Sequence, residues 1–302
     1  MPDDPQTLFK QKSRSFSLAA KLFSPGIRGD IAQLYAFCRH VDDLADSSQG
    51  GKPGELRRLR EMLDQGAGDC DDPVVRRFLR LAERRKLPLD AARELASASE
   101  ADCGPRRVQS EAELIRFAYG VAGTVGLLMQ PLLGADDPRA APFAIDLGIA
   151  LQLTNIARDV AEDAERERFY LPGAWVDPEV IGAALRERDR RASEQVDEAV
   201  EQVLKAADRY YESALAGHWF IPRRNRRAIF FALHFYRAIG RKMQRQGREA
   251  WRSRTRIGLA GKLAVGLAAY PRYRAWRKQV WSRGEPPRHD RSLHRPLKER
   301  RS

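Results

Sequence analysis

The chain has 302 residues, of which 43% are apolar and 31% are charged, and it contains three cysteines. This composition excludes a disordered chain and a small disulfide-stabilised domain, and it fits a globular protein with a sizeable buried core. The N-terminal segment has acidic residues and no apolar run behind a basic end. We therefore expect no signal peptide and a cytoplasmic protein with free thiols.

The positive charge is concentrated in the last quarter of the chain. Residues 222–302 carry 24 Lys or Arg against four acidic residues, a net charge of +20, whereas residues 1–221 carry a net charge of −7. Such asymmetry indicates either an anionic partner or a solvated basic tail. The aromatic residues there are too few and irregular for base stacking, so we expect no nucleic-acid partner. Residues 257–270, IGLAGKLAVGLAAY, instead favour peripheral contact with a membrane.

Apolar residues recur at helical spacing along most of the chain, and strand-like alternation is scarce. Helices are predicted at 28–46, 54–64, 73–86, 89–99, 110–134, 138–164, 178–186, 191–217, 222–248 and 257–269, with Pro and Gly in most of the gaps. We therefore expect an all-α protein with a single domain over residues 1–271. Residues 272–302 are basic and contain Pro, so we expect an extension with little structure of its own.

Residues 117–135 carry no charge over 19 positions, which is close to the length of a bilayer span. Four glycines, a glutamine and a proline favour a buried helix of the core instead. Gly120, Gly123 and Gly126 fall on one helical face. Small residues there leave room for a close neighbouring helix or for a long apolar substrate.

Two acidic segments carry the strongest signal for chemistry. CRHVDDLAD places Asp42 and Asp46 one helical turn apart, roughly 6 Å along the axis, and NIARDVAED repeats this spacing with Asp159 and Asp163. Asn155 lies one turn before Asp159. Carboxylates at this spacing repel each other, and Mg²⁺ bound together with substrate phosphates would relieve the repulsion. Solvated helix faces give the same pattern in a highly charged chain, so the neighbouring residues decide between these readings.

Those neighbours resemble the phytoene/squalene synthase family, and most closely its bacterial phytoene synthases. The resemblance rests on SRSFSLAAKLF (13–23), LYAFCRHVDDLAD (34–46), YGVAGTVG (119–126), LGIALQLTNIARDVAED (147–163) and RFYLP (168–172). It covers most of residues 13–250. It implies an isoprenoid-synthase-type helical bundle around a central cavity, with both motifs at the cavity mouth.

The resemblance also implies roles for individual residues. The Mg²⁺ ligands would be Asp42, Asp46, Asn155, Asp159 and Asp163. The substrate diphosphates would contact Ser13, Arg14, Ser15, Tyr35, Arg39, Gln152, Arg158, Arg168, Tyr170 and Tyr236. The cavity would be lined by Phe16, Phe37, Phe117, Tyr119, Val121, Gly123 and Val125.

The implied activity is a prenyltransferase reaction of carotenoid biosynthesis. Two prenyl diphosphates, here geranylgeranyl diphosphate, would join head to head with Mg²⁺ (or Mn²⁺) to give phytoene through a cyclopropylcarbinyl diphosphate. The alternative is a presqualene diphosphate, squalene or dehydrosqualene synthase that uses farnesyl diphosphate, with NADPH needed only for squalene. A non-catalytic scaffold relative is a remote alternative, because all four motif aspartates are present.

Two departures from the family pattern bear on the product. Phe117 stands where many members have a tyrosine that is suspected of acting in the second half-reaction, and Glu167 replaces the usual glycine before Arg168. The substrate chain length, the final product and the oligomeric state remain open at this point.

Overall fold

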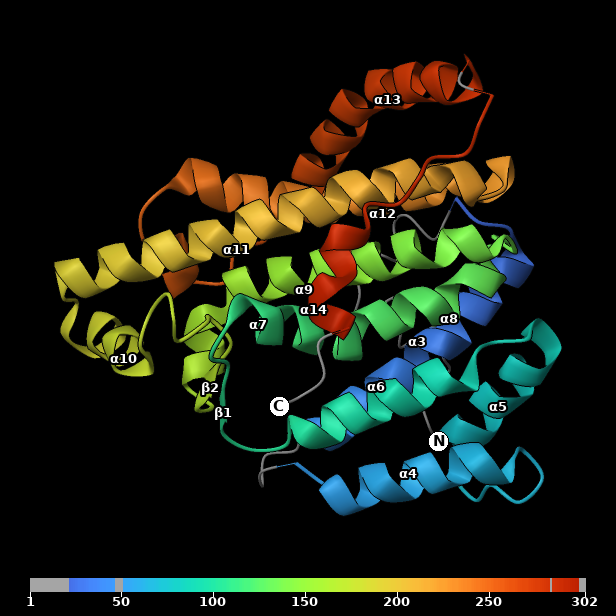
Figure 1. Ribbon diagram of the computed structural model, residues 1–302, viewed down its shortest axis with the longest axis horizontal. Coiled ribbons are helices and arrows are strands. Elements are labelled where there is room, and N and C mark those ends of the chain that lie inside the picture. Colours follow the sequence, from blue (N-terminus) through green and yellow to red (C-terminus); the bar gives the residue numbers. More distant parts are fainter. Residues whose placement is uncertain (1–21, 47–50, 283, 299–302) are drawn as a thin grey trace.

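The computed structural model describes residues 22–46, 51–282 and 284–298. Within these ranges the chain is a bundle of helices with one pair of two-residue strands (Figure 1). The α-helices are α3 (Pro25–Ala45), α4 (Pro53–Gln65), α5 (Pro73–Arg85), α6 (Leu89–Ala101), α7 (Glu111–Ala118), α8 (Thr124–Leu132), α9 (Ala141–Ala164), α10 (Pro178–Glu187), α11 (Arg190–Gly217), α12 (Arg223–Gln246), α13 (Leu259–Ser282) and α14 (Arg295–Lys298). Shorter helical turns cover Tyr119–Gly123, Pro138–Ala140, His218–Phe220, Ala250–Arg252 and Arg291–His294. The all-α fold class is confirmed.

The helices begin where the sequence supplies caps. Helix α5 has proline at its first position, and the Asp72 carboxylate accepts hydrogen bonds from the backbone N–H groups of Val74 and Val75 at 2.7 and 3.0 Å. At the start of α11, Asp189 accepts one from Ala192 at 2.7 Å. These local signals explain why the predicted helices match the observed ones within a few residues at most ends.

Helix α9 runs through the middle of the bundle and packs against α8, α11 and α12 (Figure 1). A Cβ atom on Gly148 of α9 would lie 2.1 Å from the carbonyl oxygen of Ala122, and one on Gly126 of α8 would lie 2.1 Å from that of Ala144. The two segments therefore meet backbone to backbone. The glycine face of the uncharged segment serves this close packing.

Two core segments, Glu111–Leu132 and Pro138–Ala164, are long and apolar enough to cross a membrane by length and composition. Both lie at the centre of the bundle, where Thr124, Leu128 and Leu153 are fully buried. The prediction of a core helix over residues 117–135 is confirmed, apart from one π-helical turn at Tyr119–Gly123.

The strands β1 (Arg106–Arg107) and β2 (Arg168–Phe169) pair in parallel. The Arg106 N–H donates to the Glu167 carbonyl at 3.1 Å, and the Val108 N–H donates to the Phe169 carbonyl at 3.0 Å. This short ladder fixes the chain that leaves α9 and thereby fixes the position of Arg168.

The expectation that residues beyond Pro271 have little structure is corrected. Helix α13 continues through Pro271 to Ser282. Proline removes one helical hydrogen bond, but Ala269 and Tyr273 on either side of it are buried against Phe230 of α12. This packing holds the helix together across the proline.

The segment after α13 also packs on the body. In Figure 1 the chain returns across α9 and ends in α14, which contacts α7. Leu293 and Leu297 lie against the core, and the Tyr210 hydroxyl donates to the Leu293 carbonyl at 2.8 Å. Residues 284–298 are therefore an ordered strap across the bundle.

Candidate active site

A cavity of about 910 Å³ lies between α3, α8, α9 and α12. Along α9 its lining residues recur every three or four positions from Phe143 to Arg158, so the cavity follows one face of this helix for about 22 Å. At the Arg158 end the lining is polar and comprises Tyr35, Asp42, Gln152, Asn155, Arg158, Tyr236 and Arg254. At the Phe143 end it comprises buried residues, namely Leu133, Ala135, Ala140, Phe143, His218 and Ile221.

The first acidic motif lies at the C-terminal end of α3. Asp42 lines the polar end of the cavity, where its side chain is exposed. The protein around this end of the cavity partly desolvates the carboxylate and raises the pKa of Asp42 to about 7, and the nearby carboxylates of Asp46 and Asp43 act in the same direction against Arg39. Asp46 caps the helix and accepts a hydrogen bond from Arg168 Nη1 at 2.5 Å.

The second motif occupies the last three turns of α9. Arg158 forms a bidentate pair with Asp159, with its Nε donating at 2.7 Å. Arg254 Nε lies 3.4 Å from Asp159 Oδ1, and its Nη1 donates to Glu162 at 2.9 Å. Burial, together with the charge on Asp159, raises the pKa of Asp163 to about 7.

Arg168 connects the two motifs. It donates to Asp46 at the end of α3, and its positive charge lowers the pKa of Asp163 on α9. The Arg168 side chain is 11% exposed. The β1–β2 ladder thus places one buried guanidinium between two acidic helix ends that lie more than a hundred residues apart in the sequence.

The five predicted ligands offer oxygen donors that suit a divalent cation such as Mg²⁺. Asp42 and Asp163 have raised pKa values because their charges are crowded and desolvated. A bound cation would stabilise both ionised forms. Arg39 has a buried Nε atom with no hydrogen-bond partner among the described residues, which fits an anionic group at the same place. The residues present therefore fit a cation and an anion held together.

The structure brings most of the predicted polar residues to one place. Tyr35, Gln152, Arg158 and Tyr236 line the cavity beside Asp42 and Asn155, and Val121 and Val125 line its apolar wall. Arg39 lies next to this group and pairs with Asp43. Ser13, Arg14, Ser15 and Phe16 lie outside the described residues.

Several residues predicted to line the cavity lie outside its lining in this structure. Phe37 is fully buried and stacks on Phe78 with ring centroids 3.8 Å apart. Phe117 stacks on Tyr170 at 4.6 Å. Neither phenylalanine is part of the cavity lining, and the same is true of Tyr119 and Gly123. Phe37 and Phe117 instead fill contacts with Phe78 and Tyr170 in neighbouring segments.

Tyr170 is also placed differently from its predicted role. It is buried outside the large cavity, and its hydroxyl donates to Asp102 Oδ2 at 2.6 Å. Burial raises the pKa of Asp102 to about 6, although Tyr170, Arg168 and Arg106 all lower it. Tyr170 and Asp102 therefore form a buried hydrogen-bonded pair next to Arg168.

Sequence reasoning missed the segment that follows α12. Arg254, Thr255, Arg256, Ile257, Gly258 and Lys262 line the cavity, and Arg254 contacts the second motif directly. The available signal was the cluster of three arginines at alternate positions from Arg252 to Arg256. It was hidden within a generally basic region.

Comparisons with known proteins agree with this geometry. The sequence profile of the squalene/phytoene synthase family matches residues 9–260. A 15-cis-phytoene synthase of Paracoccus sp. (strain N81106 / MBIC 01143) is 37% identical over 265 residues, covering 84% of this chain and 86% of the relative. The 15-cis-phytoene synthase of Pantoea ananas is 33% identical over 299 residues, covering 94% of each chain.

A solved structure gives the same result for the fold. The crystal structure of a dehydrosqualene synthase in complex with ligand superposes with a TM-score of 0.80 at 25% identity, covering 90% of this chain and 95% of that chain. Sequence and structure therefore agree over most of the molecule. The chain belongs to the squalene/phytoene synthase family of prenyltransferases.

Proposed function

We propose that the protein joins two molecules of geranylgeranyl diphosphate head to head to form phytoene, through a cyclopropylcarbinyl diphosphate. The observation that carries this proposal is the cavity of about 910 Å³ that runs from the two acidic motifs into an apolar interior. Such a volume lies near the upper end for small-molecule sites, as two long apolar chains require. Relatives named phytoene synthase at 33–37% identity support the choice of substrate.

We infer that Mg²⁺ is the cofactor and that Asp42, Asp46, Asn155, Asp159 and Asp163 hold it. When bound, it would neutralise diphosphate oxygens and favour their departure. The arginines contribute to the same charge balance. Arg158 and Arg254 lie beside Asp159, and Arg168 lies beside Asp46. They bind the departing diphosphate as the allylic cation develops.

The rest of the cavity protects that cation. Val121, Val125, Leu147 and Leu151 present aliphatic side chains to the substrate and keep water away from it. Two diphosphates and two protons must leave for each phytoene formed, one of each in each half-reaction. The polar end offers no histidine among its described residues, so we assign the final proton to the departing diphosphate. Phe117 lies outside the cavity lining, so a tyrosine hydroxyl at this position would not face the substrate. We therefore include the second half-reaction in the proposal.

The test is incubation of the purified protein with Mg²⁺ and geranylgeranyl diphosphate, followed by mass analysis of the product. We expect a C40 hydrocarbon, and we expect EDTA to abolish it. Accumulation of the cyclopropyl diphosphate would contradict the second half-reaction alone. No consumption of substrate would reject the enzymatic proposal.

A second candidate is condensation of two farnesyl diphosphates. The likeness to a dehydrosqualene synthase at TM-score 0.80 favours it, whereas the sequence relatives favour the longer substrate. The same assay with farnesyl diphosphate, with and without NADPH, distinguishes them. A C30 product at a higher rate than the C40 product would select this candidate, and a requirement for NADPH would identify squalene.

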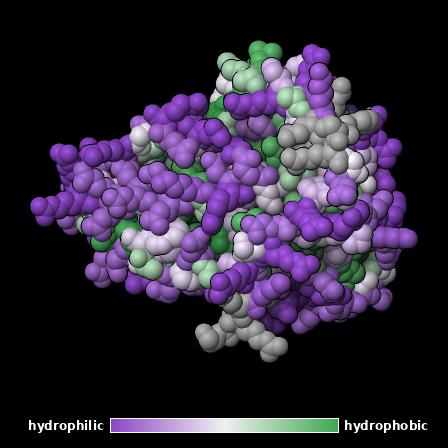
Figure 2. Space-filling view, turned by 45° about the horizontal axis from the view of Figure 1, so that its top comes forward, coloured by the Kyte–Doolittle hydropathy of each residue, from purple (hydrophilic) through white to green (hydrophobic). Residues whose placement is uncertain are grey.

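We also propose that the protein works in the cytoplasm at a membrane surface, with α13 as the contact. Leu259, Leu263 and Leu267 follow each other at four-residue spacing and are 66%, 58% and 76% exposed. Figure 2 shows hydrophobic side chains at the top of a largely hydrophilic face. Exposed Arg272 and Arg274 on the same helix favour anionic lipid headgroups.

Sedimentation with phosphatidylglycerol vesicles tests this contact. Leu263→Glu should lower the bound fraction strongly, because it places a charge within the apolar stripe. Gln244→Glu makes the same change of charge at an exposed position of α12 and should bind almost as the parent does. Equal binding by both variants would reject α13 as the contact.

A further inference from the structure

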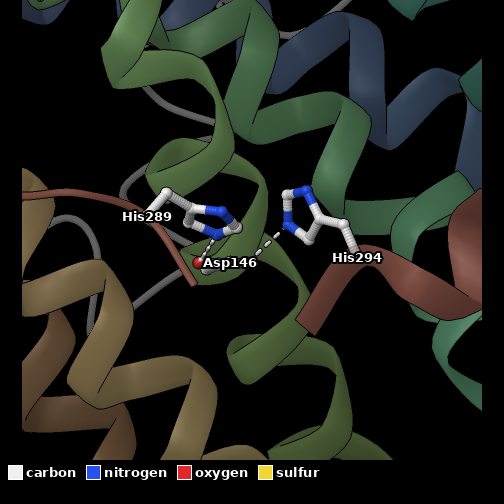
Figure 3. A group of neighbouring side chains, drawn as sticks. All are labelled: Asp146, His289 and His294. Atoms are coloured by element: carbon white, nitrogen blue, oxygen red, sulfur yellow. Dashed lines mark hydrogen bonds and ion pairs between the residues drawn. The ribbon is translucent and has the colours of Figure 1, made fainter. Parts of the chain in front are cut away.

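A histidine–aspartate cluster joins the C-terminal strap to α9 (Figure 3). Asp146 lies 13 positions before Asp159 on this helix, about 20 Å from the second acidic motif. Asp146 is fully buried. His294 Nε2 lies 2.7 Å from its Oδ1 and His289 Nε2 lies 2.9 Å from its Oδ2. Ser213 of α11 donates to the second oxygen at 2.5 Å. The two imidazole rings are 4.5 Å apart, so both reach one carboxylate from the same segment.

Hydrogen bonds hold Asp146, His289 and His294 together, and we call this cluster the clasp. The Nε2 atoms of His289 and His294 each lie at ordinary hydrogen-bond distance from a different carboxylate oxygen of Asp146. These bonds and that of Ser213 outweigh burial and keep the pKa of Asp146 below its usual value. The ligand atoms of Asp146, His289 and His294 lie within 4.8 Å of one another, so Zn²⁺ is the competing occupant. The two histidines pair with different oxygens of Asp146, and this favours the hydrogen-bonded arrangement over a bound Zn²⁺.

The clasp lies directly behind the closed end of the cavity. Phe143 lines that end and is three residues before Asp146, on the same turn of α9. Its ring packs edge-on against His289, with ring centroids 5.2 Å apart, and at a tilt against Phe220, with ring centroids 5.7 Å apart. A Cβ atom on Gly217 would lie 2.2 Å from Phe143 Cβ, so α11 also presses on it. Phe143 therefore has substrate space on one side and the strap on the other.

The length of the cavity makes this end important for specificity. Asn155 at the polar end and Phe143 are twelve positions apart on α9, which corresponds to about 18 Å. A prenyl chain whose diphosphate is held near Asn155 points its tail toward Phe143. An additional isoprene unit would need the space that the Phe143 ring occupies.

We propose that Phe143 sets the longest prenyl chain that the cavity accepts, and that the Asp146–His289–His294 clasp holds Phe143 in place. The C-terminal strap is then a specificity element of the enzyme. This inference rests on the proposed function, because it assumes prenyl diphosphate substrates. Phe143 contacts the substrate tail, whereas Asp146, His289 and His294 are positioning residues.

The test measures binding and does not depend on turnover. Dissociation constants are determined with Mg²⁺ for the unreactive S-thiolodiphosphates of the farnesyl (C15), geranylgeranyl (C20) and geranylfarnesyl (C25) chains. We expect Phe143→Ala to improve C25 binding relative to C20 by about tenfold or more, the scale for opening an apolar pocket. His289→Ala, which removes the ring behind Phe143, should change the ratio in the same direction by a smaller factor.

A matched pair at His294 separates positioning from general damage. His294→Leu removes the hydrogen bond to Asp146 and should raise the C25 to C20 ratio. His294→Gln keeps a donor and should restore the parental ratio. Arg291→Gln, at an exposed position of the same strap, is the control. Thermal unfolding of each variant is measured in parallel to show that it folds.

Each outcome tests a different part of the proposal. If Phe143→Ala leaves the chain-length ratio unchanged, the specificity proposal is wrong. If that variant shifts the ratio but His289→Ala and His294→Leu do not, the strap does not position Phe143. Stoichiometric zinc in the purified protein, lost in His294→Leu, would replace the clasp by a metal centre. Tight binding of the analogues without turnover of geranylgeranyl diphosphate would reject the proposed function and leave the chain-length result valid.

Discussion

Replacement of Tyr170 by phenylalanine separates a structural role from a substrate-binding role. The Tyr170 hydroxyl donates to Asp102 Oδ2 at 2.6 Å, and both residues are buried. The other oxygen of Asp102 has no hydrogen-bond partner among the described residues, with Arg106 Nε 3.8 Å away. Loss of a hydrogen bond to a buried charged group costs about 2 kcal/mol. The stack on Phe117 at 4.6 Å is kept in the variant.

We therefore expect Tyr170→Phe to lower the melting temperature by about 4 °C at pH 8. The loss should be smaller at pH 5, because the pKa of Asp102 is about 6 and the protonated carboxyl has less need of a donor. Differential scanning calorimetry measures both values. Tyr270→Phe, at a half-exposed position of α13, is the control. An unchanged melting temperature together with a tenfold higher KM would show that Tyr170 binds the diphosphate, against our placement.

Three further predictions concern stability. In EDTA the protein should become less stable from pH 5 to pH 8. The folded pKa values of Asp42 and Asp163, about 7, lie above their unfolded values, and ionisation therefore favours the unfolded state. Asp163→Asn should flatten this dependence of the melting temperature on pH, and an equally steep dependence would contradict the burial of that carboxyl. Glu167 has φ of 56°, so Glu167→Gly should stabilise the fold by up to about 1 kcal/mol in urea unfolding; a loss of stability would show that its side chain has a structural role. Gly148→Ala should cost more than about 3 kcal/mol or prevent folding, because its Cβ atom would lie 2.1 Å from a backbone oxygen of the neighbouring segment. Gly54→Ala, where a Cβ atom meets nothing within 4 Å, is its control, and equal unfolding curves for these two variants would disprove the tight crossing.

The sequence predicted the helices and the acidic motifs well because both depend on local patterns. Proline, glycine and capping aspartates such as Asp72 and Asp189 mark the helix ends by their own chemistry. The spacing of Asp159 and Asp163 places both on one helical face whatever surrounds them. These features need only the residues within a few turns.

The remaining site residues depend on contacts between distant segments. Phe37 and Phe117 were expected in the cavity, but an apolar residue at helical spacing gives no sign of which neighbour will cover it. Likewise, His289 meets Asp146 across 143 residues of sequence. Its segment seemed unstructured because it is basic and contains proline. Packing that brings such distant partners together is set by the whole bundle.

The central claim is that the two acidic motifs act together on the diphosphate at the polar end of the cavity. The most direct measurement is the rate of diphosphate release from geranylgeranyl diphosphate with Mg²⁺ in Asp159→Asn and in Glu162→Gln. Both variants remove one negative charge from the same helix next to Arg254. The account predicts a loss of about 100-fold or more for Asp159→Asn and a rate close to the parental one for Glu162→Gln. Equal rates in the two variants would contradict it.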